Sequence, residues 1–269
     1  MAVNFVSKLK YDVSDLLKIM KILRSPEGCP WDREQTHESI KKSLIEETYE
    51  VVEAINKNDK ELMTEELGDV LLQVVFHSQI GAENGEFDFS DVCDGICKKL
   101  IERHPHVFGD ISVKDSGEVM ENWEQITSRT KHRKTQTDKM LSVPRELPAL
   151  MRSAKIQEKA SKVGFDWEDV SGAFQKLSEE SDELKAAVQN NDRENMTEEL
   201  GDLLFSVVNV SRFINVDAEE ALTASTDKFL NRFAIVERLA KERNIDMSTS
   251  SIEELDSLWD EAKNITKSN

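Results

Sequence analysis

Helical periodicity runs along almost the whole chain. Apolar residues recur three or four positions apart, and no useful stretch alternates between apolar and polar side chains as a half-buried strand would. Prolines, glycines and Asn-Asp pairs divide this pattern into segments of helical length. The predicted helices cover residues 12–24, 38–57, 60–82, 88–103, 116–128, 148–162, 171–190, 192–214, 217–243 and 252–265. The chain is therefore expected to be all-α.

One sequence unit occurs twice. The heptapeptide Met-Thr-Glu-Glu-Leu-Gly-Asp stands at residues 63–69 and again at 196–202, and the same offset relates Glu46-Glu47 to Glu179-Glu180 without a gap. The part best preserved between the two copies is acidic. A solvated helix surface does not require the same acids at the same places, whereas a bound cation does.

The repeat predicts two domains. Residues 129–147 are the expected linker, because they are polar and basic at first and then carry Pro144. The predicted domains therefore cover residues 1–128 and 148–269, a tandem repeat of two four-helix-bundle-like units with short connections. Small bundles of this kind need a partner to cover their apolar faces, so pairing of units or of chains is expected.

The composition excludes two classes of partner. The formal net charge of −18 disfavours a nucleic-acid partner, since binding a phosphate backbone requires clustered Lys and Arg. No apolar run reaches the roughly 18 residues of a spanning helix, and residues 1–10 lack the layout of a signal peptide. The protein is therefore expected in the cytoplasm, without a membrane partner. Cys29, Cys93 and Cys97 form an odd set without a CxxC motif and are expected to be buried free thiols.

Acidic residues of neighbouring predicted helices share one face. A spacing of three places Glu47 and Glu50 a turn apart on one helix, and Glu66 and Asp69 have the same spacing on the next. The Asn58-Asp59 turn folds the two helices back antiparallel, so the four carboxylates converge beside apolar core positions. The second unit repeats this set with Glu180, Glu183, Glu199 and Asp202.

Four carboxylates this close cannot all stay ionised without compensation. Mg²⁺ is the expected ion, one or more per site, because it takes oxygen ligands and completes its shell with waters and substrate phosphates. The adjacent Glu46 and Glu179 would then orient or deprotonate a water. Gly68 and Gly201 each cost a helix about 1 kcal/mol against Ala, which the close approach of a helix or ligand would explain. The alternative is a solvated acidic face without a metal.

The acidic pattern, Glu-Glu-x-x-Glu followed by Glu-x-x-Asp, resembles that of the MazG-type nucleoside triphosphate pyrophosphohydrolases. These enzymes belong to the all-α NTP pyrophosphatase group. Further segments similar to that family occur in order along nearly the whole chain. They are residues 28–32, 35–37, 103–108, 123–126, 147–150, 155–157 and 163–167.

The resemblance implies Mg²⁺-dependent hydrolysis of a nucleoside triphosphate to the monophosphate and pyrophosphate, by a homodimer of tandem helical domains. It also implies two sets of metal ligands, which are Glu180, Glu183, Glu199 and Asp202 in the second domain and Glu47, Glu50, Glu66 and Asp69 in the first.

Basic residues are needed beside such acids to hold a triphosphate. Lys228 and Arg232 are four apart on one predicted helix face, and Lys99 and Arg103 repeat that arrangement in the first unit. The alternative is that they pair with nearby acids on the surface. The resemblance favours Trp259 for stacking on the base, and Trp123 is its analogue in the first unit. The alternative for each tryptophan is a packing role.

The two copies differ next to the acids. Lys176 lies three residues before Glu179, where it would reach a phosphate, whereas Ser43 takes that place in the first unit. The C-terminal site is therefore expected to be the main catalyst, and the first unit weaker, regulatory or a dimerisation platform. Asn231 and Asn195 stand where the family often has basic residues, which would weaken the grip on the phosphates.

A single stacking Trp accepts any base, so broad base tolerance is expected, in a role in housekeeping or regulation of nucleotide pools. A narrower enzyme for dUTP or dCTP is an alternative within the same class. A nucleotide sensor that binds without turnover and a helical scaffold are alternatives from other classes.

Overall fold

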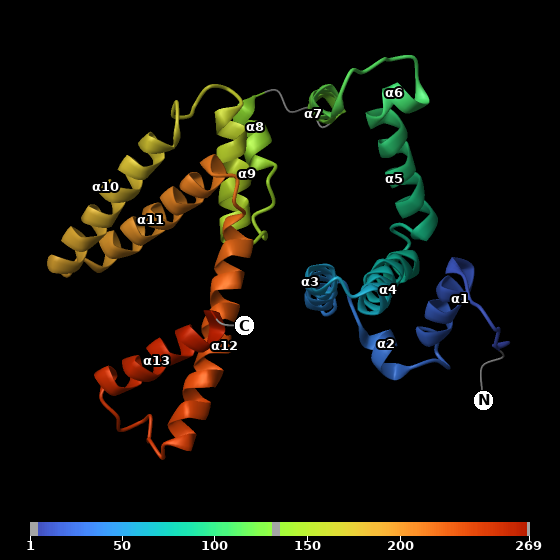
Figure 1. Cartoon of the computed structure of the whole chain (residues 1–269). Helices are drawn as coiled ribbons and strands as arrows, with labels where there is room; N and C mark the ends of the chain where they lie inside the picture. The colour runs from blue at the N-terminus through green and yellow to red at the C-terminus, as the bar shows by residue number, and fades with distance from the viewer. Residues whose placement is uncertain (1–4, 131–134, 268–269) are drawn as a thin grey trace. The chain divides into compact units, whose positions relative to one another are not determined.

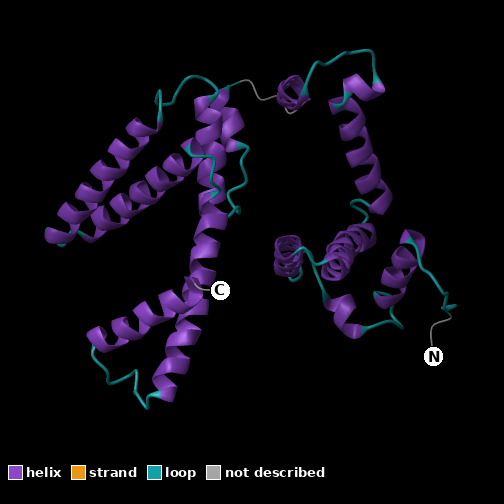
Figure 2. Cartoon of the chain, in the orientation of Figure 1, coloured by secondary structure: helices purple, strands orange, loops and turns teal. Residues whose placement is uncertain are grey.

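The computed structural model describes residues 5–130 and 135–267, and every regular element in these ranges is a helix (Figures 1 and 2). The all-α prediction is confirmed. No helix in these ranges has a stretch long and apolar enough to cross a membrane. Helices at the start of the chain are α1 (Val13–Leu23), α2 (Pro30–Glu34), α3 (Lys41–Lys57), α4 (Lys60–Asn84), α5 (Phe89–Arg103), α6 (Pro105–Phe108) and α7 (Ser116–Thr130). Those that follow are α8 (Gln136–Leu141), α9 (Ala149–Ser161), α10 (Val170–Gln189), α11 (Arg193–Phe213), α12 (Ala218–Glu242) and α13 (Ile252–Lys267).

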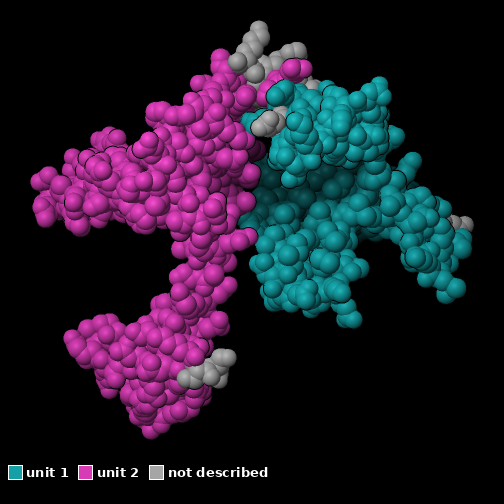
Figure 3. Space-filling model, turned by 45° about the horizontal axis from the view of Figure 1, so that its top comes forward, with its two compact units in different colours: residues 1–127 teal, residues 128–269 magenta. Residues whose placement is uncertain are grey.

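The chain divides into two compact units, Met1–Thr127 and Ser128–Asn269 (Figure 3). The segment 129–147, which was predicted to be a linker, contains α8. That helix begins at a capping box in which Thr135 and Asp138 each accept a hydrogen bond from the other's backbone N–H. The side-chain amide of Gln136 donates to the backbone carbonyl of Lys159 on α9, which attaches α8 to the second unit. The basic residues 131–134 lie outside the described residues.

Each unit is built on a helical hairpin, α3–α4 in the first and α10–α11 in the second (Figure 1). Both turns use an asparagine with a left-handed backbone, Asn58 at φ 52° and Asn191 at φ 53°. Asparagine tolerates this region better than most residues. The aspartate that follows caps the next helix: Asp59 accepts hydrogen bonds from two backbone N–H groups of α4, and Asp192 accepts one in α11. The repeated Asn-Asp pair therefore gives both hairpins the same turn.

Two buried clusters form the cores. One joins α1 to α4 and contains Met20, Ile40, Val75, Phe76 and Ile80. The other lies between α12 and α13 and contains Val236, Leu239, Ala240, Leu258 and Ala262. The α10–α11 hairpin, in contrast, keeps apolar side chains between 42% and 53% exposed, namely Phe174, Val188, Leu200, Leu204 and Phe205. The hairpin that carries the second acidic set therefore has an apolar surface that its own unit does not cover.

The cysteines differ from the prediction. Cys93 and Cys97 are free but exposed on α5, and Cys29 is half-buried. The expectation of buried thiols was wrong because α5 is covered on little of its surface, as the exposure of its neighbours Ile96 and Leu100 also shows.

A buried arginine joins three parts of the first unit. Arg24 follows α1, and its side chain is only 6% exposed. The guanidinium donates to both carboxylate oxygens of Glu83 on α4, and to the backbone carbonyls of Asp32 and Gln35 around α2. Burial opposes ionisation of Glu83, but hydrogen bonds from Arg24 and Gln79 outweigh it and lower the pKa of that carboxyl.

We expect Glu83→Gln to destabilise the first unit by about 1–3 kcal/mol near neutral pH. This is less than the loss from breaking a fully buried pair, because Glu83 is 35% exposed. A lowered folded pKa stabilises the protein above the pKa of an unfolded glutamate, about 4.3, and this contribution is lost as the pH falls through the folded value. Urea unfolding near pH 7 and near pH 3 measures the effect. The difference in the free energy of unfolding between the native chain and the variant should be smaller at the lower pH. Glu86→Gln, at an exposed position, is the matched control. If Glu83→Gln lowered the free energy of unfolding equally at both pH values, the ion-pair explanation would be contradicted.

Candidate active site

The second acidic set converges between α10 and α11. Glu180 on α10 and Glu199 and Asp202 on α11 each place a carboxylate oxygen so that the three atoms lie within 4.8 Å of one another. Glu180 is only 3% exposed, Glu199 is half-buried and Asp202 is exposed. The group therefore extends from the inside of the hairpin to its surface, where an ion or substrate can reach it.

The first unit repeats this geometry between α3 and α4. Carboxylate oxygens of Glu47, Glu66 and Asp69 also lie within 4.8 Å of one another, and all three residues are half-buried. The predicted fourth members, Glu50 and Glu183, are exposed one turn further along α3 and α10 and are not part of these three-atom groups. The structure thus brings together three of the four predicted ligands in each unit.

The electrostatics of both groups disfavour full ionisation. Burial, followed by repulsion from Asp69, raises the pKa of Glu47, and a hydrogen bond shared with Glu50 adds to this. Burial and the charge of Glu50 raise the pKa of Glu66 in the same way. In the second unit, burial and the charges of Glu183 and Glu180 raise the pKa of Glu199. A divalent cation bound by these oxygens would remove the repulsion.

Lys176 distinguishes the two sites. Its Nζ lies 2.5 Å from a carboxylate oxygen of Glu180 and 3.7 Å from one of Glu179. The hydrogen bond to Glu180 raises the pKa of Lys176, which keeps it charged. Ser43 occupies the matching position in the first unit, so that unit has no equivalent ammonium group there.

The two residues predicted to act on water lie beside the acid groups. Glu46 and Glu179 are both exposed, on α3 and α10. The carboxylate of Glu179 accepts a hydrogen bond of 3.2 Å from the side-chain amide of Gln175, one turn earlier on the same helix. Both acids are therefore adjacent to the clustered oxygens in sequence while their carboxylates face solvent.

The chain matches known proteins over most of its length. The sequence profile of the MazG nucleotide pyrophosphohydrolase domain matches twice, at residues 35–108 and 155–236. The chain belongs to the MazG family. Each match contains one acidic hairpin, so the repeat seen in the sequence is a repeat of the MazG domain.

Three relatives show how far the similarity extends. The nucleoside triphosphate pyrophosphohydrolase/pyrophosphatase MazG of Thermotoga maritima is 49% identical over 249 residues, covering 93% of this chain and 94% of that protein. The nucleoside triphosphate pyrophosphohydrolase of Escherichia coli K12 is 44% identical over 254 residues, covering 93% and 97%. The uncharacterized protein YabN of Bacillus subtilis is 48% identical over 256 residues, covering 95% of this chain but 52% of that protein.

Apart from Lys176, the predicted substrate-binding residues of the second MazG domain lie on α12 and α13 and not on the acidic hairpin. Figure 1 shows α13 and the C-terminal half of α12 directed away from the α10–α11 hairpin. Lys228 is exposed on α12, and Nε of Arg232 donates to the hydroxyl of Thr266 on α13 at 3.4 Å. Trp259 packs against Phe229 at 5.1 Å between ring centroids. Within one chain these residues therefore line the α12–α13 pair and not the acidic group.

The counterparts in the first MazG domain engage one another. Lys99 is exposed on α5, whereas Arg103 is buried with its guanidinium 5.0 Å from the ring centroid of Trp123. His104 meets the same indole edge-on at 5.1 Å. Trp123 therefore packs against Arg103 and His104 in this structure, and its role in base contact stays a prediction.

Gly68 and Gly201, which precede Asp69 and Asp202, have no close neighbour among the described residues. An added Cβ at Gly68 or Gly201 would meet nothing within 4 Å. Of the two expected explanations, a helix or a ligand, the close approach of a neighbouring helix is not found among the described residues.

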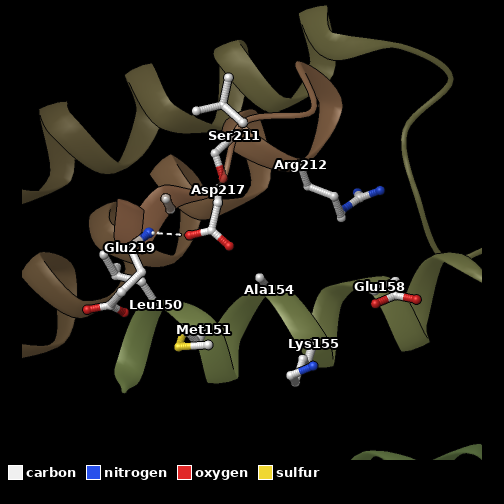
Figure 4. Close-up of a pocket in the computed structure, with 11 residues that line it drawn as sticks. Leu150, Met151, Ala154, Lys155, Glu158, Ser211, Arg212, Asp217 and Glu219 are labelled. Carbon is white, nitrogen blue, oxygen red and sulfur yellow. Dashed lines mark hydrogen bonds between the residues drawn. The ribbon is translucent and has the colours of Figure 1, made fainter. Parts of the chain in front are cut away.

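A small cavity lies where α9 meets the junction between α11 and α12 (Figure 4). It has a volume of about 260 Å³ and is lined by apolar side chains with the charged groups Lys155, Glu158 and Arg212 around them. Asp217, at its edge, accepts hydrogen bonds from the backbone of Glu219 and Glu220 as the cap of α12. We assign this cavity to the packing of the α11–α12 turn.

Proposed function

We propose that the chain hydrolyses nucleoside triphosphates to nucleoside monophosphates and pyrophosphate, using Mg²⁺, and that the α10–α11 site of the second domain is the main catalyst. The observation that carries the proposal is the group of Glu180, Glu199 and Asp202, with Lys176 beside it. Membership of the MazG family and the names of the Thermotoga and Escherichia relatives, both nucleoside triphosphate pyrophosphohydrolases, support the substrate class.

The donor set fits a hard divalent cation. Glu180, Glu199 and Asp202 would hold Mg²⁺ through oxygen atoms, with Glu183 one turn away as a further ligand. When bound, the ion neutralises charge on phosphate oxygens and makes a water more acidic. The raised pKa of Glu199 indicates that the acids gain from such an ion.

The protein's own residues supply the remaining functions. Lys176 is within reach of the same oxygens, so its ammonium group would hold a phosphate that enters the site. Glu179 lies next to the ligands and faces solvent, where it would orient a water and accept its proton. In the first domain Glu46 takes the corresponding place, but without a lysine beside the acids the site there is expected to be weaker or regulatory.

A homodimer completes this proposal. Apolar side chains are exposed on α10 and α11, and a second exposed apolar set lies on α12 and contains Leu222, Phe229 and Leu230. Two copies of the chain could bury these two surfaces against each other. A second copy that covers the hairpin with its own α12–α13 pair would bring Lys228 and Arg232 toward the acids. Opposite charge makes this the favourable arrangement, since the acidic group has one lysine and at least three carboxylates.

The proposed setting is the cytoplasm, where the enzyme would act on nucleotides in general and control the composition of the pool. The nucleotide sensor is the second candidate, because the carboxylate geometry would bind a metal–nucleotide complex whether or not it turns over.

The test is pyrophosphate release from each of the eight common ribo- and deoxyribonucleoside triphosphates and from dUTP. We expect release from all of them with Mg²⁺, with rates that differ by less than about tenfold between bases, and loss of release after chelation by EDTA. Chromatography should show the monophosphate as the second product. Release from dUTP or dCTP alone would contradict broad tolerance, and binding without release would indicate the sensor.

A further inference from the structure

Two histidines of the first domain meet where the chain enters α3. His37 lies in the turn between α2 and α3, and His77 lies on α4; both are half-buried. The Nδ1 atoms of the two rings are 2.7 Å apart, which is a hydrogen-bond distance, and the ring planes are parallel to within 4°. One Nδ1 must therefore carry a proton and the other must not.

The surroundings of His77 decide which ring donates. Its other ring nitrogen, Nε2, is buried and has no hydrogen-bond partner among the described residues. A proton on that atom would be a buried donor without an acceptor, which is unfavourable. The proton of His77 therefore lies on Nδ1, from which it is donated to the bare Nδ1 of His37.

This hydrogen bond is compatible only with a neutral pair. A proton taken up by His37 would occupy Nδ1, the atom that accepts the bond. A proton taken up by His77 would occupy the buried Nε2 and leave a charged ring with an unpaired donor. Burial, followed by the nearby charge of His37, accordingly lowers the pKa of His77.

The bond attaches the turn before α3 to α4. Inside the turn, Thr36 and Ser39 hold each other, since the backbone N–H of each donates to the hydroxyl of the other at 2.9 and 3.2 Å. Ile40, the last residue before α3, is 4% exposed and belongs to the core cluster of the first domain. The histidine pair thus lies at the edge of that core and joins the entry of α3 to the helix on which α3 packs.

The acids near the pair are already engaged or face solvent. Glu38, next to His37, is paired with Lys41 at 2.5 Å, and that interaction lowers the pKa of Glu38. Of the charged groups of the first domain, His37 is the one whose charge acts on the pKa of His77. The remaining neighbours along the chain are uncharged, cap a helix or are exposed, namely Gln73 and Gly81 on α4, Asp88 at the start of α5, and Glu86.

The repeat shows that packing alone does not require histidine at these positions. The offset of the heptapeptide places Val170 at His37 and Val210 at His77. Val210 is 8% exposed and Val170 is half-buried. The second domain therefore has, at both matching positions, side chains that cannot take up a proton.

We propose that His37 and His77 form a pH-sensitive clamp, which holds residues 35–40 to α4 while both rings are neutral and releases them when the pair takes up a proton. A folded pKa below that of a free histidine, about 6.5, stabilises the clamp above this value, and the contribution is lost as the pH falls from it toward the folded pKa. Opening would loosen the start of α3, and with it the first acidic hairpin, while the second hairpin stays closed. The clamp goes beyond the proposed function and does not depend on catalysis in the second domain.

Hydrogen exchange of the full chain, read by mass spectrometry at pH 7.5 and pH 5.5 with EDTA present, tests the clamp. The quantity compared is the protection of amides 36–44 relative to an unstructured peptide at the same pH. We expect it to fall by about 3- to 10-fold at pH 5.5. Tenfold is the approximate limit for one histidine, because a free side chain at one pH unit below its pKa is about ten times more often protonated than not. Amides 169–177, the second-domain counterpart, should keep their protection.

Three variants separate the clamp from general loosening in acid. The double variant His37→Val with His77→Val copies the second domain and should be equally protected at both pH values. His37→Asn keeps a carbonyl oxygen that can accept from His77 and does not titrate, so it should lose less protection than the native chain and decides the matter if the double variant does not fold. Glu38→Gln, which removes the flanking ion pair, is the matched control and should lose protection as the native chain does.

Nitrogen NMR of the imidazole rings gives a readout that a merely structural role would not move. We expect the proton of His77 on Nδ1 at pH 7.5, and its titration below pH 6.5. A proton on Nε2 of His77 would overturn the proposal. So would unchanged protection of amides 36–44 at pH 5.5, an equal loss in amides 169–177, or a loss in the double valine variant as large as that of the native chain.

Discussion

Asp202→Asn is expected to lower pyrophosphate release on the order of 1,000-fold, because it removes a charged oxygen ligand and leaves the volume of the side chain unchanged. Asp202 is exposed at the surface end of the group, so the substitution disturbs no core packing. The helix itself should stay intact, since the carboxylate is not a cap of α11. Pyrophosphate release at saturating ATP and Mg²⁺ measures the loss, and unfolding in urea should show the variant as stable as the native chain.

The repeat provides a matched control for this change. Asp69→Asn alters the identical heptapeptide in the first domain, with the same neighbours in sequence. We expect it to retain at least about half of the activity, because the first site lacks the lysine beside its acids. Equal losses from both substitutions would mean that both sites catalyse. A loss from Asp69→Asn alone would reverse the assignment of the two domains.

The hairpins could be predicted from sequence because their signals are local. The turn at Asn58-Asp59 and its copy in the second unit specify a left-handed residue and a helix cap, and the acids follow at fixed spacing from it. Helical spacing alone then places Glu180, Glu199 and Asp202 on facing sides of α10 and α11. The short helices α2, α6 and α8 were missed because they have one or two turns, too few for periodicity to appear.

The rest of the site depends on contacts between distant segments. One example is the contact of α9 with α11, where the side-chain amide of Gln157 donates to the backbone carbonyl of Phe205, because no spacing in the sequence relates these two residues. The positions of Lys228 and Arg232 relative to the acids also could not be derived, because helical spacing fixes a face of α12 and not what that face meets.

If a second copy brings Lys228 and Arg232 to the acids, two inactive variants should restore each other when they form a mixed dimer. One variant is Asp202→Asn, which removes one carboxylate from the acidic group. The other is Arg232→Ala, which removes the proposed phosphate-binding guanidinium. In a mixed dimer one site combines the native acids of one chain with the native arginine of the other, and the second site has both defects. Random mixing makes half of the dimers mixed, so activity should return to about a quarter of the native value.

The alternative arrangement gives a clear opposite result. If Arg232 acts on the acids of its own chain, every site in a mixed dimer keeps one defect, and co-expression restores nothing. Sedimentation of the mixture, with a purification tag on one variant only, confirms that mixed dimers have formed. Co-expression of Asp202→Asn with Glu199→Gln is the control, because both changes lie in the same acidic group and no pairing of chains rebuilds it. Restoration in the first mixture and not in the control would show that the active site of this MazG protein is shared between two chains, whereas a monomer in sedimentation would reject the homodimer altogether.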